Sequence, residues 1–305
     1  MTTPPTSPAT TPVIPTGQSS PSGVARPDGR TVTWAECGAA QGAPVLWCHG
    51  SPASRLDADP TGPFAAGYTA GGIRVIAWDR PGYGGSTPHP GRTLADDAED
   101  GVAVADALGL GTFAVLGYSG GGPVALTLAQ HLAERVAAVG VVAGIAPPGV
   151  ADHTDLAEHD LFDLAATDPA ALRVTLAELA AGLRTDTVAT AQLMLGPGLT
   201  DADLAMLADP AYAVMLMATL AESARHDLAG YAEDIDTLRT DWSPTLSAVH
   251  QRVHLVHGTT DRVVPIRHSR ALAAAPPDAS LTEVDGGHLS VLTYLPTLVT
   301  AMLST

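Results

Sequence analysis

Three residues that lie far apart in the sequence have the side-chain types needed for nucleophilic catalysis. Ser119 lies in the stretch Gly117-Tyr118-Ser119-Gly120-Gly121, where an apolar strand pattern gives way to a helical pattern. This G-x-S-x-G spacing suits a sharp turn, because residues without side chains let the strand and the helix approach closely. Such a turn pushes the hydroxyl outward and places backbone N–H groups beside it. Taken alone, the motif is also compatible with a glycine-rich connection that carries an idle serine.

A serine hydroxyl is a weak nucleophile without a base, so this chemistry requires a histidine and an acid elsewhere in the chain. Asp261 follows an apolar strand pattern at Val253–Val256, and His288 follows another at Ser280–Val284. The order serine, acid, histidine is the one associated with this kind of turn. We therefore predict that Ser119 is a nucleophile, His288 its base and Asp261 the acid that orients the histidine.

The elements that position these residues alternate between strand and helix patterns. Short apolar runs that end in turn signals are typical of strands buried in a mainly parallel sheet. They occur at Pro44–Cys48, Arg74–Trp78, Phe113–Gly117, Val136–Ile145, Val253–Val256 and Ser280–Val284, and Thr31–Cys37 shows the alternating pattern of a further strand. Helical patterns follow at Thr93–Leu108, Gly120–Leu132, Pro265–Ala275 and Leu289–Leu303. The alternation predicts a layered α/β domain, in which reactive groups gather beyond the carboxyl ends of the strands.

Two segments depart from this alternation. Residues 1–22 are rich in Thr, Pro and Ser, a composition that predicts an unstructured tail. Residues 147–240 contain only helical patterns and are too long for a loop. We expect this second segment to be an inserted helical lid, or cap, on an α/β core formed by residues 23–146 and 241–305. The segment holds sixteen acidic residues and four arginines, which indicates a solvated surface or a lid that disfavours anionic substrates.

With these motifs placed, the chain from about Gly29 onward resembles the α/β-hydrolase fold family. The resemblance rests on the serine turn, the late aspartate and histidine, and two loops that follow early strands, His49-Gly50-Ser51-Pro52 and Asp79-Arg80-Pro81-Gly82. It implies a mostly parallel central sheet flanked by helices. It also implies that the backbone N–H groups of Ser51 and Gly120 form an oxyanion hole, and that His49 braces the loop.

The same resemblance separates several activities found on this fold. Epoxide hydrolases and dehalogenases carry aspartate at the nucleophile position, where this chain has Ser119. Proline iminopeptidases have a His-Gly-Gly-Pro-Gly loop and a tryptophan after the serine, where this chain has Ser51, Ala53 and Gly120. The pattern favours a serine hydrolase that cleaves an ester-type bond of a small, mostly apolar molecule. Perhydrolysis, acyl transfer or lyase chemistry on the same triad, a peptidase similar to the proline iminopeptidases, and a non-catalytic ligand receptor remain alternatives.

Composition narrows the range of partners. The net charge is −17, and all 15 basic residues are arginines, so we expect neither nucleic acid nor an anionic membrane as a partner. The absence of lysine excludes Schiff-base chemistry and the phosphate-binding loop of many nucleotide hydrolases. The sequence also shows neither a membrane span nor a signal peptide, which favours a cytoplasmic protein. Its oligomeric state cannot be predicted from these features.

No cofactor or metal is expected from the remaining candidates. Cys37 and Cys48 are too few for a four-thiolate zinc site, and the sequence favours two free thiols over a single disulfide bridge between them. His254 and His257 lie three residues apart on a predicted strand, so their side chains should point to opposite faces and not share a metal. Asp79 is interpreted as a structural residue that fixes the turn after it.

Overall fold

The computed structural model describes residues 22–59 and 62–304. The predicted N-terminal tail lies outside the described residues, apart from Ser22 at its end. Ser22 is not part of a tail, because it begins the first strand of the sheet.

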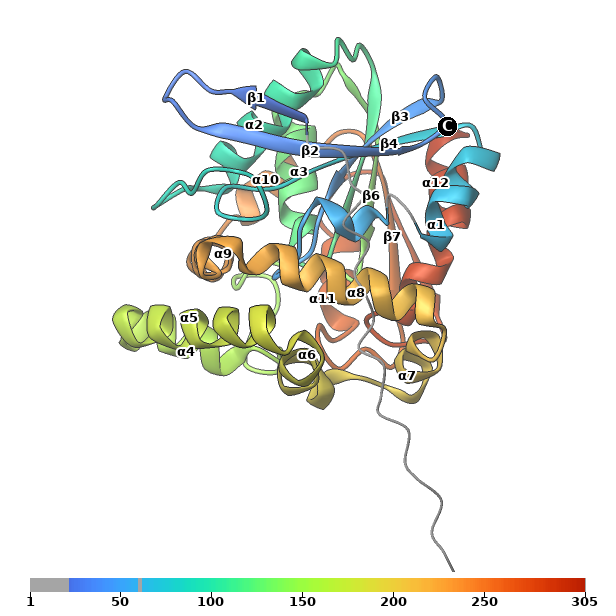
Figure 1. Ribbon diagram of the computed structural model, residues 1–305. Coiled ribbons are helices and arrows are strands. Elements are labelled where there is room, and N and C mark those ends of the chain that lie inside the picture. Colours follow the sequence, from blue (N-terminus) through green and yellow to red (C-terminus); the bar gives the residue numbers. More distant parts are fainter. Residues whose placement is uncertain (1–21, 60–61, 305) are drawn as a thin grey trace, which may run out of the picture.

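A twisted sheet of eight strands forms the centre of the described chain (Figure 1). The strands are β1 (Ser22–Ala25), β2 (Thr31–Gly38), β3 (Ala43–Cys48), β4 (Ile73–Trp78), β5 (Phe113–Tyr118), β6 (Val136–Val142), β7 (Arg252–Gly258) and β8 (Ala279–Val284). Their order across the sheet is β1-β2-β4-β3-β5-β6-β7-β8. From β4 to β8 all neighbours are parallel, whereas β2 is antiparallel to both of its neighbours. The predicted α/β class is therefore confirmed.

The strand predictions differ from the structure at three places, each for a physical reason. β1 was not predicted, because its four residues lack an apolar run. It lies at the end of the sheet and pairs only with β2. β6 ends at Val142, before the predicted Ile145, because Ala143 adopts a positive φ of 49°. β8 forms the other edge of the sheet and is partly exposed, so it is not buried on both faces as expected.

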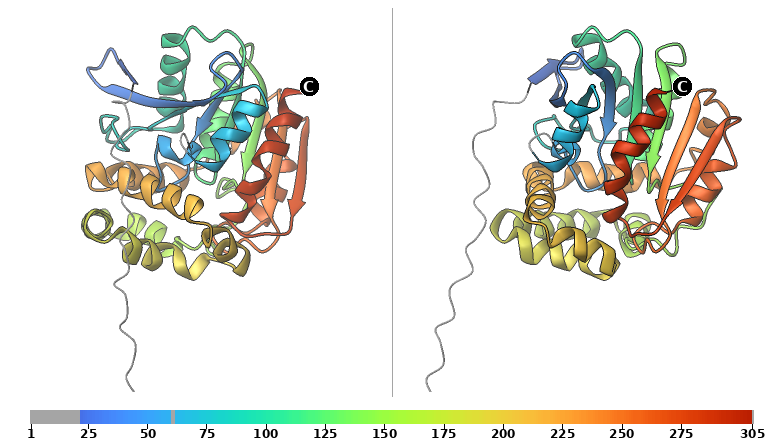
Figure 2. Two further views of the ribbon diagram at one scale, coloured as in Figure 1. Left: turned by 45° about the vertical axis from the view of Figure 1, so that its right-hand side comes forward. Right: turned by 90° about the vertical axis from the view of Figure 1, so that its right-hand side faces the viewer.

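Helices cover both faces of the sheet, as two views from other sides show (Figure 2). These helices are α1 (Pro63–Ala70), α2 (Leu94–Ala107), α3 (Gly121–His131), α10 (Ser243–Ser247), α11 (Arg267–Ala273) and α12 (Leu295–Leu303), with short 3-10 turns η1 (Arg55–Ala58) and η4 (Ser290–Tyr294). Alternate residues of β3 point to opposite sides: Val45 and Trp47 belong to one buried cluster, Leu46 and Cys48 to another. The first cluster includes α1 and α12, and the second includes α2 and α3. The sheet is therefore held between two apolar layers.

Residues 147–240 contain helices and no strand, and they stack beyond the carboxyl ends of the parallel strands (Figure 1). Their helices are α4 (His159–Thr167), α5 (Pro169–Thr185), α6 (Thr187–Leu195), α7 (Asp201–Leu207), α8 (Pro210–Ser223) and α9 (Ala229–Leu238), with 3-10 turns η2 (Gly196–Gly198) and η3 (Ala224–His226). We call this stretch the helical segment. Asp168, Asp186 and Asp209 accept hydrogen bonds from the first turns of α5, α6 and α8. Part of the acidity noted in the sequence thus serves to cap helices.

Among the described residues, no single helix is both long and apolar enough to cross a membrane. A bent pair, α7 followed by α8 and η3, passes the same test of length and composition only when its two parts are taken together.

Candidate active site

Ser119 lies at a strained turn between β5 and α3. Its φ of 52° falls in the left-handed region, which residues with side chains rarely occupy. The glycines around it are sterically required: a Cβ added to Gly117 would lie 2.4 Å from the Gly121 carbonyl oxygen. A Cβ on Gly121 would lie 2.1 Å from the carbonyl oxygen of Cys48. The turn can therefore form only because both flanking positions lack side chains, as the motif predicted.

The turn brings the Ser119 hydroxyl to His288, although the two residues are 169 positions apart. The distance between Ser119 Oγ and His288 Nε2 is 3.0 Å, and that between His288 Nδ1 and Asp261 Oδ2 is 2.7 Å. Asp261 follows β7 and His288 follows β8, so both lie beyond the carboxyl ends of the parallel strands, where β5 also ends. The structure thus joins the three predicted residues in one hydrogen-bonded chain, with the geometry of a nucleophile, a base and an orienting acid.

The surroundings of this chain set its electrostatics. Burial alone would lower the pKa of His288, but the adjacent Asp261 carboxylate outweighs it and raises that pKa above its ordinary value. Burial opposes ionisation of Asp261 as well, yet the two histidines beside it, His288 and His257, hold its pKa well below the usual range. Asp261 also accepts hydrogen bonds from the backbone N–H groups of Val263 and Val264, at 2.8 and 3.0 Å. The acid is therefore ionised and held in place at neutral pH.

The loop that carries His288 is held by Asp203, a residue of α7 in the helical segment. Asp203 is fully buried, and its Oδ1 accepts from the N–H groups of Leu289 and Ser290, at 3.0 and 2.7 Å, and from the Ser290 hydroxyl. Its Oδ2 accepts from the N–H and hydroxyl of Thr200, which caps α7. The Thr200-x-x-Asp203 capping box is visible in the sequence, but its contact with the histidine loop is not, because 86 positions separate Asp203 from Leu289.

The two predicted oxyanion-hole residues also lie together. A Cβ added to Gly120 would be 2.4 Å from Ser51 Oγ, so the loop after β3 packs directly on the serine turn. Within the described residues, the backbone N–H groups of Ser51 and Gly120 make no hydrogen bond to another group of the chain. His49 braces the loop as expected: its Nδ1 lies 2.7 Å from the Gly50 carbonyl, and its Nε2 accepts from the Arg80 N–H at 3.1 Å. This arrangement leaves two N–H donors beside the hydroxyl for a ligand oxygen.

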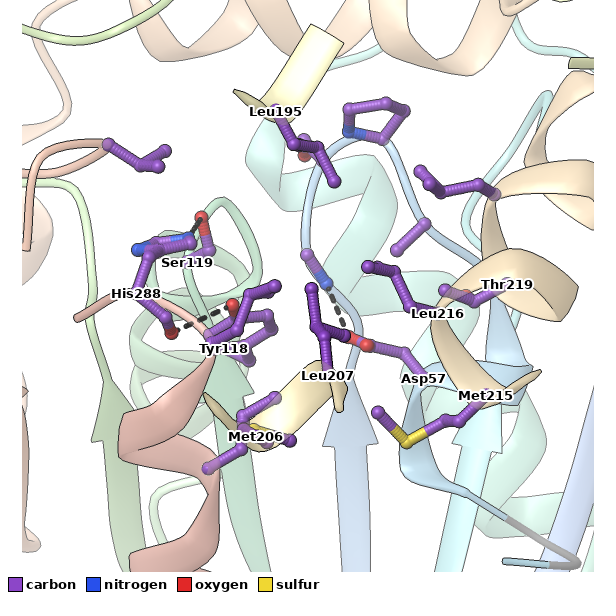
Figure 3. A pocket seen from close by; sticks show the side chains of 18 of the residues that line it. Asp57, Tyr118, Ser119, Leu195, Met206, Leu207, Met215, Leu216, Thr219 and His288 are labelled. Carbon is purple, nitrogen blue, oxygen red and sulfur yellow. Dashed lines mark hydrogen bonds between the residues drawn. The ribbon is translucent and has the colours of Figure 1, made fainter. Parts of the chain in front are cut away.

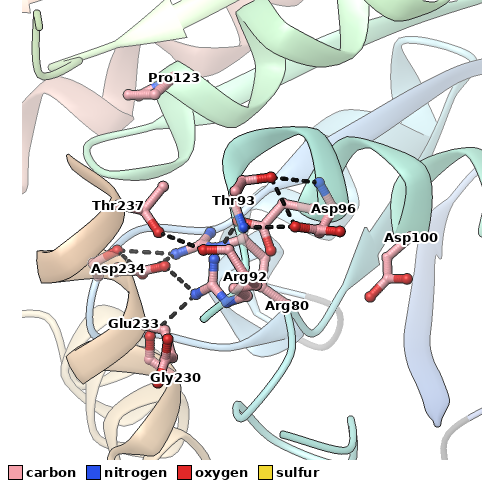
Figure 4. Close-up of polar contacts among 12 residues, drawn as sticks. Arg80, Arg92, Thr93, Asp96, Asp100, Pro123, Gly230, Glu233, Asp234 and Thr237 are labelled. Atoms are coloured by element: carbon pink, nitrogen blue, oxygen red, sulfur yellow. Dashed lines mark hydrogen bonds and ion pairs between the residues drawn. The ribbon is translucent and has the colours of Figure 1, made fainter. Parts of the chain in front are cut away.

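A buried ionic network fixes the same loop to the helical segment (Figure 4). Asp234 of α9 accepts hydrogen bonds from the Ser51 and Tyr83 hydroxyls and from the guanidinium groups of Arg80 and Arg92. The two arginines and Tyr83 are fully buried, and the arginines hold the pKa of Asp234 well below its usual range despite the burial. Asp234 was not singled out from the sequence, where it is one of many acids in the helical segment.

Asp79 holds the neighbouring turn, as predicted. It accepts from the Arg55 guanidinium at 2.6 Å, from the Gly85 N–H at 3.0 Å and from the Thr33 hydroxyl at 2.7 Å. None of these contacts reaches the serine or the histidine. Cys37 and Cys48 are free thiols, and Cys48 is buried.

Ser119 lines a small apolar pocket of about 50 Å³ (Figure 3). The helical segment provides much of its wall, through Leu195, Met206, Leu207, Met215, Leu216, Thr219 and Leu220. The core contributes Tyr118, Val263 and Leu292, among others. Two methionines, Met206 and Met215, border the pocket, where their flexible side chains can adapt to a ligand.

Two further carboxyl groups line the pocket, and both are neutralised more easily than usual. Burial raises the pKa of Asp57 to about 6, although Asp57 accepts from the Gly50 N–H at 3.1 Å. Burial also raises the pKa of Glu158 to about 7, and His288 partly opposes this. Neither residue was identified from the sequence, which gives no sign that they face the pocket. An anionic group placed here would be repelled whenever either carboxyl is ionised.

No group of three or more His, Cys, Asp or Glu side chains within 22–59 and 62–304 is arranged to hold a metal ion. His254 and His257 differ in environment as the strand period predicts, since His257 is fully buried and His254 is half-buried. His257 instead supports the site, with Nδ1 at 2.7 Å from Ser269 Oγ and Nε2 at 2.7 Å from the Val264 carbonyl.

Comparison with known proteins agrees with this architecture. The chain is 32% identical over 254 residues to 2-hydroxymuconate semialdehyde hydrolase from Pseudomonas putida, covering 79% of this chain and 78% of that protein. It is 32% identical over 232 residues to pimeloyl-[acyl-carrier protein] methyl ester esterase from Aromatoleum aromaticum, covering 74% and 85%. A 130-residue stretch, 42% of the chain, is 35% identical to a non-heme chloroperoxidase from Streptomyces lividans and spans less than half (46%) of that protein.

Solved structures show the same fold. The crystal structure of a hydrolase from Pseudomonas aeruginosa superposes with a TM-score of 0.69 at 24% identity, covering 93% of this chain and 98% of the other. The family model of the alpha/beta hydrolase fold matches residues 43–293, which include the serine turn, Asp261 and His288. The chain therefore belongs to the alpha/beta hydrolase fold family, and its relatives include hydrolases.

Proposed function

We propose that the protein is a serine hydrolase that cleaves an ester-type bond of a small, mostly apolar molecule. The observation that carries this proposal is the hydrogen-bonded chain from Ser119 Oγ through His288 to Asp261, which ends in an apolar pocket. The similarity to a methyl ester esterase over 74% of the chain supports the choice of an ester.

In the proposed reaction, His288 removes the Ser119 proton while Oγ attacks the ester carbonyl carbon. The N–H groups of Ser51 and Gly120 donate to the oxygen as it becomes negative, and loss of one such donor typically costs about 10²–10³ in rate. His288 then protonates the departing alcohol, leaving an acyl group on Ser119. Water, deprotonated by the same histidine, attacks this acyl-enzyme and releases the acid. Asp261 keeps the imidazole oriented and stabilises its protonated form throughout.

The pocket supports an uncharged substrate. Its wall is largely aliphatic, and its two carboxyl groups, Asp57 and Glu158, would repel an anion. We further propose that the helical segment acts as a cap, because it provides much of the wall around Ser119 and is fixed to the core through Asp203 and Asp234.

The test is hydrolysis of p-nitrophenyl butanoate by the purified protein and by Ser119→Ala. The parent is expected to turn over the ester and to react with a fluorophosphonate probe, while Ser119→Ala loses both properties and keeps its fold. Parent-level hydrolysis by the folded alanine variant would refute the role of Ser119. Folded parent protein that neither hydrolyses esters nor reacts with the probe would point to a receptor.

A second candidate is perhydrolysis, which the similarity to a non-heme chloroperoxidase favours. Here hydrogen peroxide takes the place of water: it gives a proton to His288 and attacks the carbonyl carbon of the acyl-enzyme. The bond between that carbon and Ser119 Oγ then breaks, His288 returns the proton to Ser119, and the product released is the peracid. Adding increasing peroxide during ester turnover distinguishes the two. Hydrolysis predicts that the carboxylic acid remains the main product, and perhydrolysis predicts that peracid replaces it.

A further inference from the structure

The space next to Ser119 is too small for most esters. A cavity of about 50 Å³ holds only a few water molecules, whereas pockets that enclose small-molecule ligands measure about 300–1,000 Å³. The wall therefore has to yield when a substrate with more than a few carbon atoms binds. The part of the wall that can yield determines where the rest of the substrate goes.

A second, larger cavity lies within the helical segment. It measures about 480 Å³ and lies among α6, α7 and α8. Among the described residues that line it, none is charged and Gln192 is the only polar one. Leu204 and Val188, which line it, are 54% and 44% exposed, so the cavity is an open groove. We call it the distal groove.

Three leucines belong to both cavities. Leu195 at the end of α6, Leu207 at the end of α7 and Leu216 in α8 line the pocket at Ser119 and also the distal groove. Figure 3 shows the three side chains around the same pocket as Ser119 and His288. Leu195 and Leu207 pack against the apolar core but are only half-buried, so their side chains are less tightly enclosed than those of the buried core. The two cavities thus share part of their walls through these three side chains.

We propose that the distal groove binds an unbranched alkyl chain of the substrate, which passes between these leucines while its ester group lies at Ser119. This inference rests on the proposed ester hydrolysis and assigns it a substrate class: esters with a medium or long linear chain. The apolar lining fits such a chain, and each buried methylene should raise kcat/KM about three- to fourfold. The helical segment as a whole holds sixteen acidic residues and four arginines, which opposes docking of the groove on an anionic membrane.

The experiment measures kcat/KM for p-nitrophenyl esters of butanoate, octanoate and dodecanoate. The relevant quantity is kcat/KM for the dodecanoate ester divided by kcat/KM for the butanoate ester. Widening the passage with Leu207→Ala should raise this ratio about five- to tenfold. Filling the groove with Ala213→Trp should lower it by a similar factor, since Ala213 lines the groove but not the pocket at Ser119. Val174→Trp is the matched control, because Val174 is exposed on α5 and lines neither cavity.

A second set of substrates, butanoate esters of butanol, octanol and dodecanol, shows whether the acyl or the alcohol chain occupies the groove. The proposal is supported if, in either set, Leu207→Ala raises the ratio and Ala213→Trp lowers it, and changes in the opposite directions count against it. Ratios that stay at the parent value in both sets, with Leu207→Ala and Ala213→Trp folded by thermal denaturation, would overturn it. The proposal also fails if Ala213→Trp alters only self-association or vesicle binding, since the groove would then be an interface. The proposed function is tested separately by the loss of butanoate ester hydrolysis in Ser119→Ala, because that loss depends on the nucleophile and not on the chain-length ratio.

Discussion

Replacing Asp203 should weaken both the stability of the fold and the activity of Ser119, although Asp203 does not touch the serine. Its carboxylate accepts five hydrogen bonds, two of them from the backbone N–H groups that directly follow His288. Asp203→Ala removes all of these acceptors. The backbone N–H groups of Thr200, Leu289 and Ser290 all lose their acceptor. A buried N–H group left without an acceptor costs about 1–3 kcal/mol, so we expect a loss of at least about 3 kcal/mol in the free energy of unfolding.

The effect on activity follows from the position of His288. Without Asp203, the histidine loop loses its attachment to α7, and a displacement of about 1 Å at a reacting group can cost about 10²-fold in rate. We expect kcat to fall 10- to 100-fold, with a smaller change in KM. Asp203→Asn keeps one acceptor oxygen for Leu289 and Ser290 but places an amide opposite the Thr200 N–H, so its losses should be intermediate.

The assay combines urea denaturation with kcat and KM for p-nitrophenyl butanoate. Asp201→Asn is the matched control, since Asp201 is an exposed acid in the first turn of the same helix. The reasoning fails if Asp203→Ala keeps the stability and the kcat of the parent protein. It also fails if Asp201→Asn produces the same losses, because a general effect of charge in α7 would then explain them.

Three further predictions concern the site and its supports. Only neutral His288 can accept the serine proton, and the pKa of His288 is raised, so kcat/KM should increase with pH through a midpoint above 6.5. Asp261→Asn should move that midpoint to lower pH. A pH–rate profile of the variant with an unmoved midpoint contradicts this. Asp234→Ala leaves two buried arginines without their shared carboxylate, so urea denaturation should show a loss of stability of about 3–5 kcal/mol. A loss below about 1 kcal/mol would show that the arginines find other partners. Gly121→Ala places a methyl group against the Cys48 carbonyl and should abolish ester turnover or soluble expression, and a fully active variant would show that the turn tolerates side chains.

The parts of the fold and of the site that depend on local sequence were predictable. Strand patterns mark seven of the eight strands. Continuous apolar runs mark β3 to β7, because buried parallel strands need them, whereas β2 shows as an alternating pattern. Ser119 was recognisable since its glycine neighbours are required by the turn itself. Asp261 and His288 followed from a general property of parallel sheets, whose carboxyl ends meet at one edge.

The parts that depend on packing between distant segments were not predictable. α1 was missed because Pro63–Ala70 has no clear apolar face, and its burial comes from contact with α12 and the sheet. Glu158 and Asp203 are acids in a segment full of acids, and only the folded chain shows that one faces the pocket and the other holds the histidine loop. Pairing across 80 or more positions leaves no periodic trace in a single sequence.

The attachment of α9 to the core through Asp234 limits how this protein can be redesigned. A chimera that exchanges residues 147–240 for the corresponding stretch of a relative would have to keep a carboxylate at position 234, or replace Arg80 and Arg92 with uncharged residues at the same time. Deleting the stretch to obtain a minimal catalyst would leave both guanidinium groups and the Ser51 loop without their common partner. The helical segment and the rest of the described chain are therefore best treated as a single unit in directed evolution.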